Sequence, residues 1–139
     1  MKKKNTLLLF LCLFSLWAVA QEKKPVKIAC VGNSITYGSG IKNQFQNSYP
    51  GLLSQLLGEG YDVRNFGISA RVLLNKGDHP YMHEQKFRDL LAFQPDIVTI
   101  KLGTNDSKPW NWRYGKDFKK DLTEMLDILQ ELPSKPKIY

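Results

Sequence analysis

Val26-Lys27-Ile28-Ala29-Cys30-Val31-Gly32 is a short, largely apolar run that ends at a glycine. Such a run predicts a β-strand that is buried on both faces of a sheet. Similar runs lie at residues 61–66 and 96–102, each followed directly by a glycine, and a fourth begins at residues 137–139. Neighbouring runs are about 35 to 40 residues apart, a spacing that leaves room for a helix between two parallel strands.

Amphipathic helical patterns fill the intervals between these runs. Residues 48–57, 84–93 and 116–132 each carry leucine or phenylalanine on one face and end near a glycine or a proline. Strands that alternate with helices favour an α/β protein. We therefore predict a three-layer α/β/α fold with a parallel, flavodoxin-like sheet, in which the chain stops inside the fourth strand.

The first 20 residues, MKKKNTLLLFLCLFSLWAVA, have the pattern of a secretory signal peptide. Three lysines precede an apolar run at residues 7–17, and the small residues at 18–20 match a cleavage site. The apolar run is too short to span a bilayer core of about 30 Å, which argues against a transmembrane anchor. We expect cleavage after Ala20, a secreted or periplasmic protein without a stable membrane anchor, a polar lead-in at 21–25 and one domain over 26–139.

Composition and charge exclude other classes of protein. The chain is 42% hydrophobic and 12% aromatic, as expected for a globular protein rather than a disordered one. Residues 1–20 hold three lysines and no acidic residue, so their removal lowers the formal charge from +7 to +4. The remaining lysines and arginines are scattered, and we expect no nucleic-acid partner. Cys30 is then the only cysteine, and its place within a strand indicates a core residue.

Glycines and polar residues follow each of the first three predicted strands. The three segments are Gly32-Asn33-Ser34, Asn65-Phe66-Gly67 and Gly103-Thr104-Asn105-Asp106. Because ligands bind beyond the carboxyl ends of parallel strands, we expect these segments to share one edge of the sheet. Acyl transfer needs a nucleophile and donors for the oxyanion, which a serine hydroxyl, backbone N–H groups and an asparagine amide can supply. Each segment alone is equally well explained by a turn or a helix cap.

Taken together and in this order, the three segments resemble the SGNH hydrolase family, also called GDSL-like esterases and lipases. The resemblance implies a nucleophile and two oxyanion donors, namely Ser34, Gly67 and Asn105. It implies supporting roles for Gly32, Asn33, Gly103 and Asp106. The implied activity is serine ester hydrolysis without a metal or another cofactor. The glycines near Ser34 form neither a dinucleotide fingerprint nor a phosphate-binding loop, because no Gly-Lys-Ser/Thr follows.

Residues 107–112 (SKPWNW), together with the GNSIT form of the first segment, are similar to secreted sialate O-acetylesterase-like members of the family. This similarity implies that the substrates are O-acyl esters of carbohydrates, in particular O-acetyl esters. Trp110 and Trp112 are therefore candidates for substrate binding, because an indole face can bury a sugar ring. The two side chains face the same way in an extended segment but diverge by about 200° in a helix.

Two features depart from the family pattern. Asn33 stands where the family has aspartate, and asparagine can still form hydrogen bonds there. The family also completes its triad with an Asp-x-x-His segment, whereas the histidines here are His79 and His83, preceded three residues earlier by lysine and proline. These two histidines are expected to be surface loop residues without a third metal ligand.

The missing segment leaves two interpretations open. In the first, the chain is the N-terminal part of an SGNH hydrolase domain, inactive alone, and the catalytic histidine and aspartate lie beyond Tyr139. In the second, the chain is a non-catalytic carbohydrate-binding α/β module or a pseudoenzyme.

Overall fold

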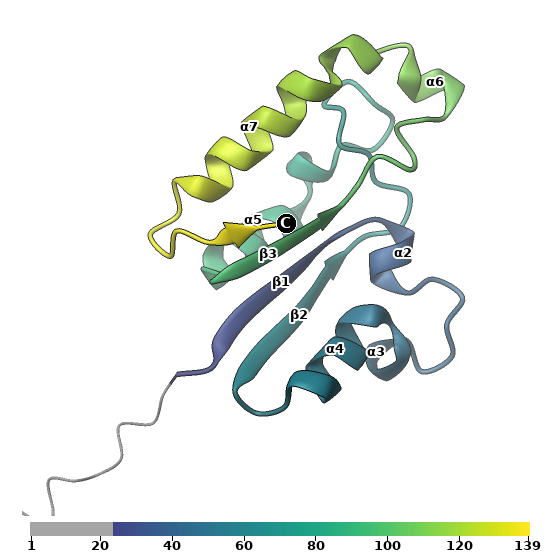
Figure 1. The fold of residues 1–139 in the computed structure, drawn as a ribbon. Coiled ribbons are helices and arrows are strands. Elements are labelled where there is room, and N and C mark those ends of the chain that lie inside the picture. The colour runs from purple at the N-terminus through teal and green to yellow at the C-terminus, as the bar shows by residue number, and fades with distance from the viewer. Residues whose placement is uncertain (1–23) are drawn as a thin grey trace, which may run out of the picture.

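Four parallel strands form the centre of the fold in the computed structural model, which describes residues 24–139 (Figure 1). The strands are β1 (Val26–Gly32), β2 (Tyr61–Gly67), β3 (Ile97–Lys101) and β4 (Lys137–Ile138). Their order in the sheet is β2-β1-β3-β4, and every neighbouring pair is parallel. The predicted α/β fold is confirmed. The predicted signal peptide lies outside the described residues and stays a prediction.

Three longer helices occur where the apolar patterns predict them. They are α4 (Tyr49–Leu57), α5 (Gln85–Phe93) and α7 (Phe118–Gln130). The structure adds shorter turns of helix, which are α2 (Ser34–Tyr37), α3 (Gln44–Asn47), η1 (Tyr81–His83), α6 (Pro109–Trp112) and η2 (Gly115–Asp117). A single turn is too short to show a helical period, so these elements could not be predicted from hydrophobic periodicity.

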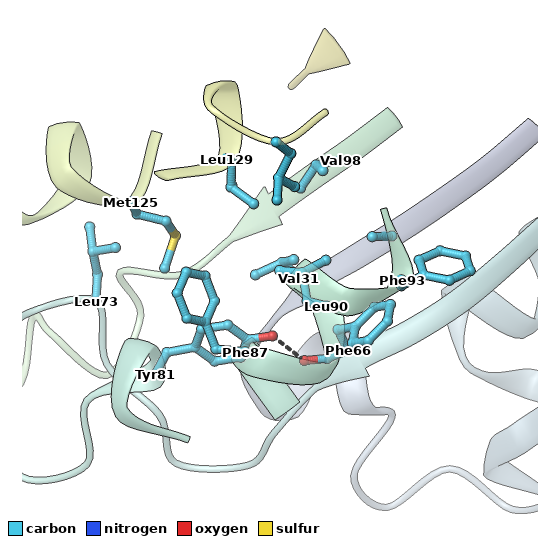
Figure 2. Close-up of a cluster of buried hydrophobic side chains, with 12 residues drawn as sticks. Val31, Phe66, Leu73, Tyr81, Phe87, Leu90, Phe93, Val98, Met125 and Leu129 are labelled. Atoms are coloured by element: carbon cyan, nitrogen blue, oxygen red, sulfur yellow. Dashed lines mark hydrogen bonds between the residues drawn. The ribbon is translucent and has the colours of Figure 1, made fainter. Parts of the chain in front are cut away.

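Helices cover both faces of the sheet, as Figure 1 shows. On one face α5 and α7 pack against β1, β2 and β3, and Figure 2 shows the resulting core. Val31 and Val98 from the sheet meet Leu90 of α5 and Leu129 of α7, all fully buried. The Tyr81 hydroxyl, in the same cluster, donates a hydrogen bond of 2.6 Å to the Phe66 carbonyl.

Helix α4 lies on the opposite face. Its Tyr49 hydroxyl is 3.2 Å from the Thr99 hydroxyl of β3, and Cys30 of β1 is fully buried beneath it. Burial raises the pKa of the Cys30 thiol, which fits the expected core residue. Burial also raises the pKa of Tyr49 to about 12. Among residues 24–139, no helix is long and apolar enough to cross a membrane.

The strand register brings three loops to one edge of the sheet. Gly32, at the end of β1, pairs with Gly67 at the end of β2 and with Lys101 at the end of β3. The chain therefore leaves all three strands at the same level. The expected grouping of the loops that carry Ser34 and Asn105 is confirmed at the level of the backbone.

Gly67 lies directly beneath α2. A β-carbon at this position would overlap the backbone of Thr36 and Tyr37. The turn that carries Ser34 can therefore approach β2 closely only because residue 67 has no side chain.

We predict that Gly67→Ala destabilises the fold, because α2 must move away from β2 and a steric overlap in a packed region costs about 1–3 kcal/mol. Denaturant unfolding of the full-length protein measures the change. Gly60→Ala is the matched control, because a β-carbon at Gly60 meets nothing within 4 Å. Equal stability of the two variants would show that the contact between Gly67 and α2 is not tight.

Candidate active site

Ser34 is the first residue of α2, directly after β1. The side chain of Asn33 caps this turn, because its Oδ1 atom accepts the Ile35 N–H at 3.1 Å. Asn33 is fully buried and Ser34 is half-buried. Asparagine at position 33 thus provides the capping acceptor that orients the serine turn. The Nδ2 atom of Asn33 has no partner among the described residues.

Gly32 lets the serine turn fold back over the strand ends. A β-carbon here would overlap the Thr36 side chain and lie 2.7 Å from the Lys101 carbonyl oxygen. Gly103, by contrast, has a φ of 106°, a left-handed conformation that favours glycine, and so it turns the chain after β3. Gly32 therefore supports the site because it leaves room for the serine turn, whereas Gly103 supports it because it adopts a left-handed backbone conformation.

The Gly67 N–H is already donated in this structure. Its acceptor is Oδ1 of Asn65, at 2.9 Å. The Nδ2 atom of Asn65 donates to the carbonyl of Thr36 at 3.0 Å, so this side chain also fastens β2 to the serine turn. For Gly67 to act as an oxyanion donor, its N–H must be shared with Asn65 or released from it.

Ala70, in the same loop, was not singled out by the sequence analysis. Its φ of 67° is left-handed, which costs a non-glycine residue about 1–2 kcal/mol. Ser69 Oγ is 2.6 Å from Ser39 Oγ, beyond the serine turn, and the Arg71 carbonyl accepts a hydrogen bond from Asn105. The Ala70 backbone therefore lies between the other two loops. Its N–H has no acceptor within residues 24–139 and is a further candidate oxyanion donor.

The amide of Asn105 has a fixed orientation. Its Nδ2 atom donates to the Arg71 carbonyl at 3.0 Å, and the residue is 8% exposed. An amide nitrogen carries two N–H donors, so one remains for a ligand. The bond to Arg71 also defines which end of the amide is the donor. This geometry suits the role that the sequence resemblance implies for Asn105.

Asp106 joins the loop after β3 to the loop after β2. Its Oδ1 atom accepts the N–H groups of both Leu73 and Leu74 at 2.8 Å, and the residue is fully buried. Asp106 therefore does not cap a helix, which was the other explanation open from sequence. It holds the segment after Arg71, and hence the acceptor of Asn105, in place.

Further side chains fasten residues 72–80, a stretch that contains only an isolated bridge, between Val72 and Pro80. The buried Asp121 of α7 accepts the Asn75 N–H at 2.8 Å. Lys76 pairs with Asp117 at 2.9 Å, and this bond raises the pKa of Lys76 and lowers that of Asp117. The stretch is therefore held by acidic side chains that follow β3 in the sequence.

The two tryptophans of α6 have different surroundings. Trp112 packs on Phe118 with ring centroids 6.0 Å apart, and its indole also covers Gly115. Trp110 donates its indole N–H to Asp78 at 3.0 Å and is 54% exposed. Both residues lie on one helical turn and Trp112 is 53% exposed, but Trp112 packs on another ring, so Trp110 is the better candidate for substrate contact.

The two histidines are distant from Ser34 in the sequence and are not connected to it by hydrogen bonds among the described residues. His79 and His83 are exposed, and neither side chain makes a hydrogen bond to Ser34 within the described part of the chain. The same part contains no cluster of three residues able to hold a metal ion. A groove of about 800 Å³ lies against β2 beside α3 and α4, and Ser34, Gly67 and Asn105 do not line it.

Residues 30–139 match the GDSL-like Lipase/Acylhydrolase family. The chain belongs to this family. The match includes the end of β1, the serine turn, both later loops and the other three strands. The order and the sheet-edge placement of the three segments agree with the resemblance seen in the sequence.

Similar proteins agree with this assignment. The chain is 54% identical over 111 residues to an acetylxylan esterase of Xylanibacter ruminicola, a match that covers 80% of this chain and 23% of that protein. Among solved structures, an aryl esterase of M. smegmatis is 25% identical with a TM-score of 0.63, covering 81% of this chain and 61% of that one. A carbohydrate acetylesterase from Sinorhizobium meliloti has the same TM-score and coverage at 22% identity, and it supports the fold alone. The chain thus spans about a quarter of the first protein and three-fifths of the two structures.

We predict that Asp106→Ala destabilises the protein by about 3 kcal/mol, because it leaves two buried N–H groups without an acceptor. Asp106→Asn is the matched variant, since its side-chain oxygen can still accept both bonds, and its cost should be clearly smaller. Denaturant unfolding of the full-length protein measures both. Similar losses for the two variants would show that the charge, and not the pair of hydrogen bonds, stabilises the loop.

Proposed function

We propose that this chain carries the nucleophile and the oxyanion site of a serine ester hydrolase that removes O-acetyl groups from carbohydrates. The observation that carries the proposal is the strand register, which places the capped turn of Ser34 at the same sheet edge as the fixed amide of Asn105. Family membership and the acetylxylan esterase relative support the reaction type and the substrate class.

The proposed reaction has two steps. The Ser34 hydroxyl oxygen bonds to the ester carbonyl carbon while its proton passes to a histidine, and the carbohydrate alcohol then leaves with that proton. Water next attacks the acetyl-serine and releases acetate, which restores the serine hydroxyl. In both steps the negative oxygen is held by the Ser34 N–H, by the Asn105 amide and by an N–H of the loop after β2.

Two N–H groups of that loop can take the third position. Gly67 is the donor that the resemblance implies, but Asn65 already accepts its proton. Ala70 offers an N–H without a competing acceptor among the described residues. The proton acceptor for Ser34 is proposed to be the histidine of an Asp-x-x-His segment, as the resemblance implies. We further propose that the signal peptide directs the protein to the periplasm or the exterior, where polysaccharide esters occur.

We predict that Ser34→Ala lowers kcat on p-nitrophenyl acetate and on acetylated xylan at least about a thousandfold, because no other hydroxyl replaces the nucleophile. Ser54→Ala, on α4, is the control and should keep the activity. The assay uses the full-length gene product. Retention of activity in Ser34→Ala would disprove the assigned nucleophile. A wild-type protein that binds acetylated xylan without hydrolysing it would favour the non-catalytic carbohydrate-binding module.

We also predict that Trp110→Ala lowers kcat/KM on acetylated xylo-oligosaccharides about tenfold more than on p-nitrophenyl acetate, because a stacking indole contributes about 1–2 kcal/mol to sugar binding. Phe45→Ala provides the control, since Phe45 is an aromatic residue of α3 that is 92% exposed. Equal losses on the two esters, or a large drop in melting temperature, would mean that Trp110 only packs the loop.

A further inference from the structure

Asn111 is a buried side chain, 1% exposed, whose amide is fully bonded. Its Oδ1 atom accepts the Asp78 N–H at 2.9 Å. Its Nδ2 atom donates to Asp78 Oδ1 and to the carbonyl of Asn105, each at 3.0 Å. One side chain therefore ties the backbone of the proposed oxyanion residue to Asp78, which precedes it by 27 positions in the sequence.

Asp78 continues the connection to Trp110. One carboxylate oxygen accepts from Asn111 and the other accepts the indole N–H of Trp110 at 3.0 Å. Desolvation raises the pKa of Asp78, but hydrogen bonds from Trp110 and Asn111 and the nearby His79 outweigh it and lower the pKa. The carboxylate is therefore ionised at neutral pH, and both of its oxygens act as acceptors.

The bond that Trp110 donates to Asp78 holds the indole by its edge. Trp110 is 54% exposed and Trp112 is 53% exposed, so exposure does not distinguish the two side chains. Trp112 packs on Phe118, whereas the ring of Trp110 meets the ammonium group of Lys108, whose Nζ atom is 5.6 Å from the ring centroid. A side chain whose orientation is already fixed loses less conformational entropy when it binds a ligand. The hydrogen bond to Asp78 therefore lowers the entropy cost of ligand binding at Trp110.

We infer that Asp78 and Asn111 are positioning residues, which hold the Trp110 indole and the backbone of Asn105 as one hydrogen-bonded unit. This inference rests on the proposed function, and it adds that the sugar contact and the oxyanion donor keep a fixed separation. An acetylated sugar that lies on Trp110 then presents its ester at a constant distance from Asn105. Asp78 acts on the sugar substrate through Trp110, and Asn111 acts on the reaction through Asn105.

A double-mutant cycle between Asp78 and Trp110 tests this unit. Asp78→Asn removes one of the two acceptors, and Trp110→Phe keeps an aromatic face but removes the indole N–H. The single variants and the double variant are made in the full-length protein, and kcat/KM is measured on an acetylated xylo-oligosaccharide and on p-nitrophenyl acetate. Asp89→Asn is the matched control, because this exposed carboxylate of α5 accepts a hydrogen bond from Gln85 and bonds to neither Trp110 nor Asn111.

Each single variant should lower kcat/KM on the sugar ester about fivefold to tenfold, with a smaller loss on p-nitrophenyl acetate. The double variant should lose about as much as the more damaging single variant, because both changes act on the contact between Asp78 and Trp110. Asp89→Asn should stay within about twofold of the wild type on both esters. Additive losses, or losses equal on the two esters, would overturn the inference for Asp78.

Asn111→Ala tests the other end of the unit. It should lower kcat about tenfold on both esters with a smaller change in KM, because Asn105 loses an anchor that an oxyanion donor needs. An unchanged kcat overturns the role of Asn111, and if this variant does not fold, the cycle between Asp78 and Trp110 decides alone. If the wild-type protein hydrolyses neither ester, the proposed function fails. The same cycle is then measured through the Kd for the xylo-oligosaccharide, where additive effects still overturn the inference.

Discussion

The buried carboxylate of Asp106 accepts the N–H groups of Leu73 and Leu74 and so joins the loop after β2 to the loop after β3. Both loops contribute to the candidate site, and neither is held there by a β-ladder. Buried N–H groups are costly to leave without an acceptor, so the two bonds to Asp106 Oδ1 strongly favour one arrangement of the two loops. This arrangement brings the Arg71 carbonyl within hydrogen-bonding distance of the Asn105 side chain.

The serine turn is fixed in a different manner. It packs into space left by two glycines, Gly32 and Gly67, and two asparagines bond to it, Asn33 at its start and Asn65 at its end. The position of the serine turn therefore depends on the strand register and on the absence of side chains at residues 32 and 67. The site thus combines a nucleophile on a tightly packed turn with donors on loops that are positioned by buried polar side chains.

The fold could be predicted from sequence because it depends on patterns that repeat, namely apolar strands that end at glycines and helices with one apolar face. The family segments also predicted site roles for Ser34 and Asn105, and both residues lie at the same edge of the sheet. The sequence did not reveal the hydrogen bonds of Asp78, Asn111 and Asp106, because these join residues about 30 positions apart and depend on the path of an irregular loop. Ala70 was missed because alanine is a poor indicator of a left-handed turn.

Residues 72–80 are held mainly by side chains that come later in the chain, from Asp106 to Asp121. A ribosome delivers β1, the serine turn and β2 first, and these can pair before the acidic partners exist. The loop can form its local backbone bonds early, but it gains the bonds to Asp106, Asn111 and Asp121 only after these later residues have been made. During synthesis the serine turn can therefore pack on β2 before the opposite side of the candidate site has acquired the side chains that hold it.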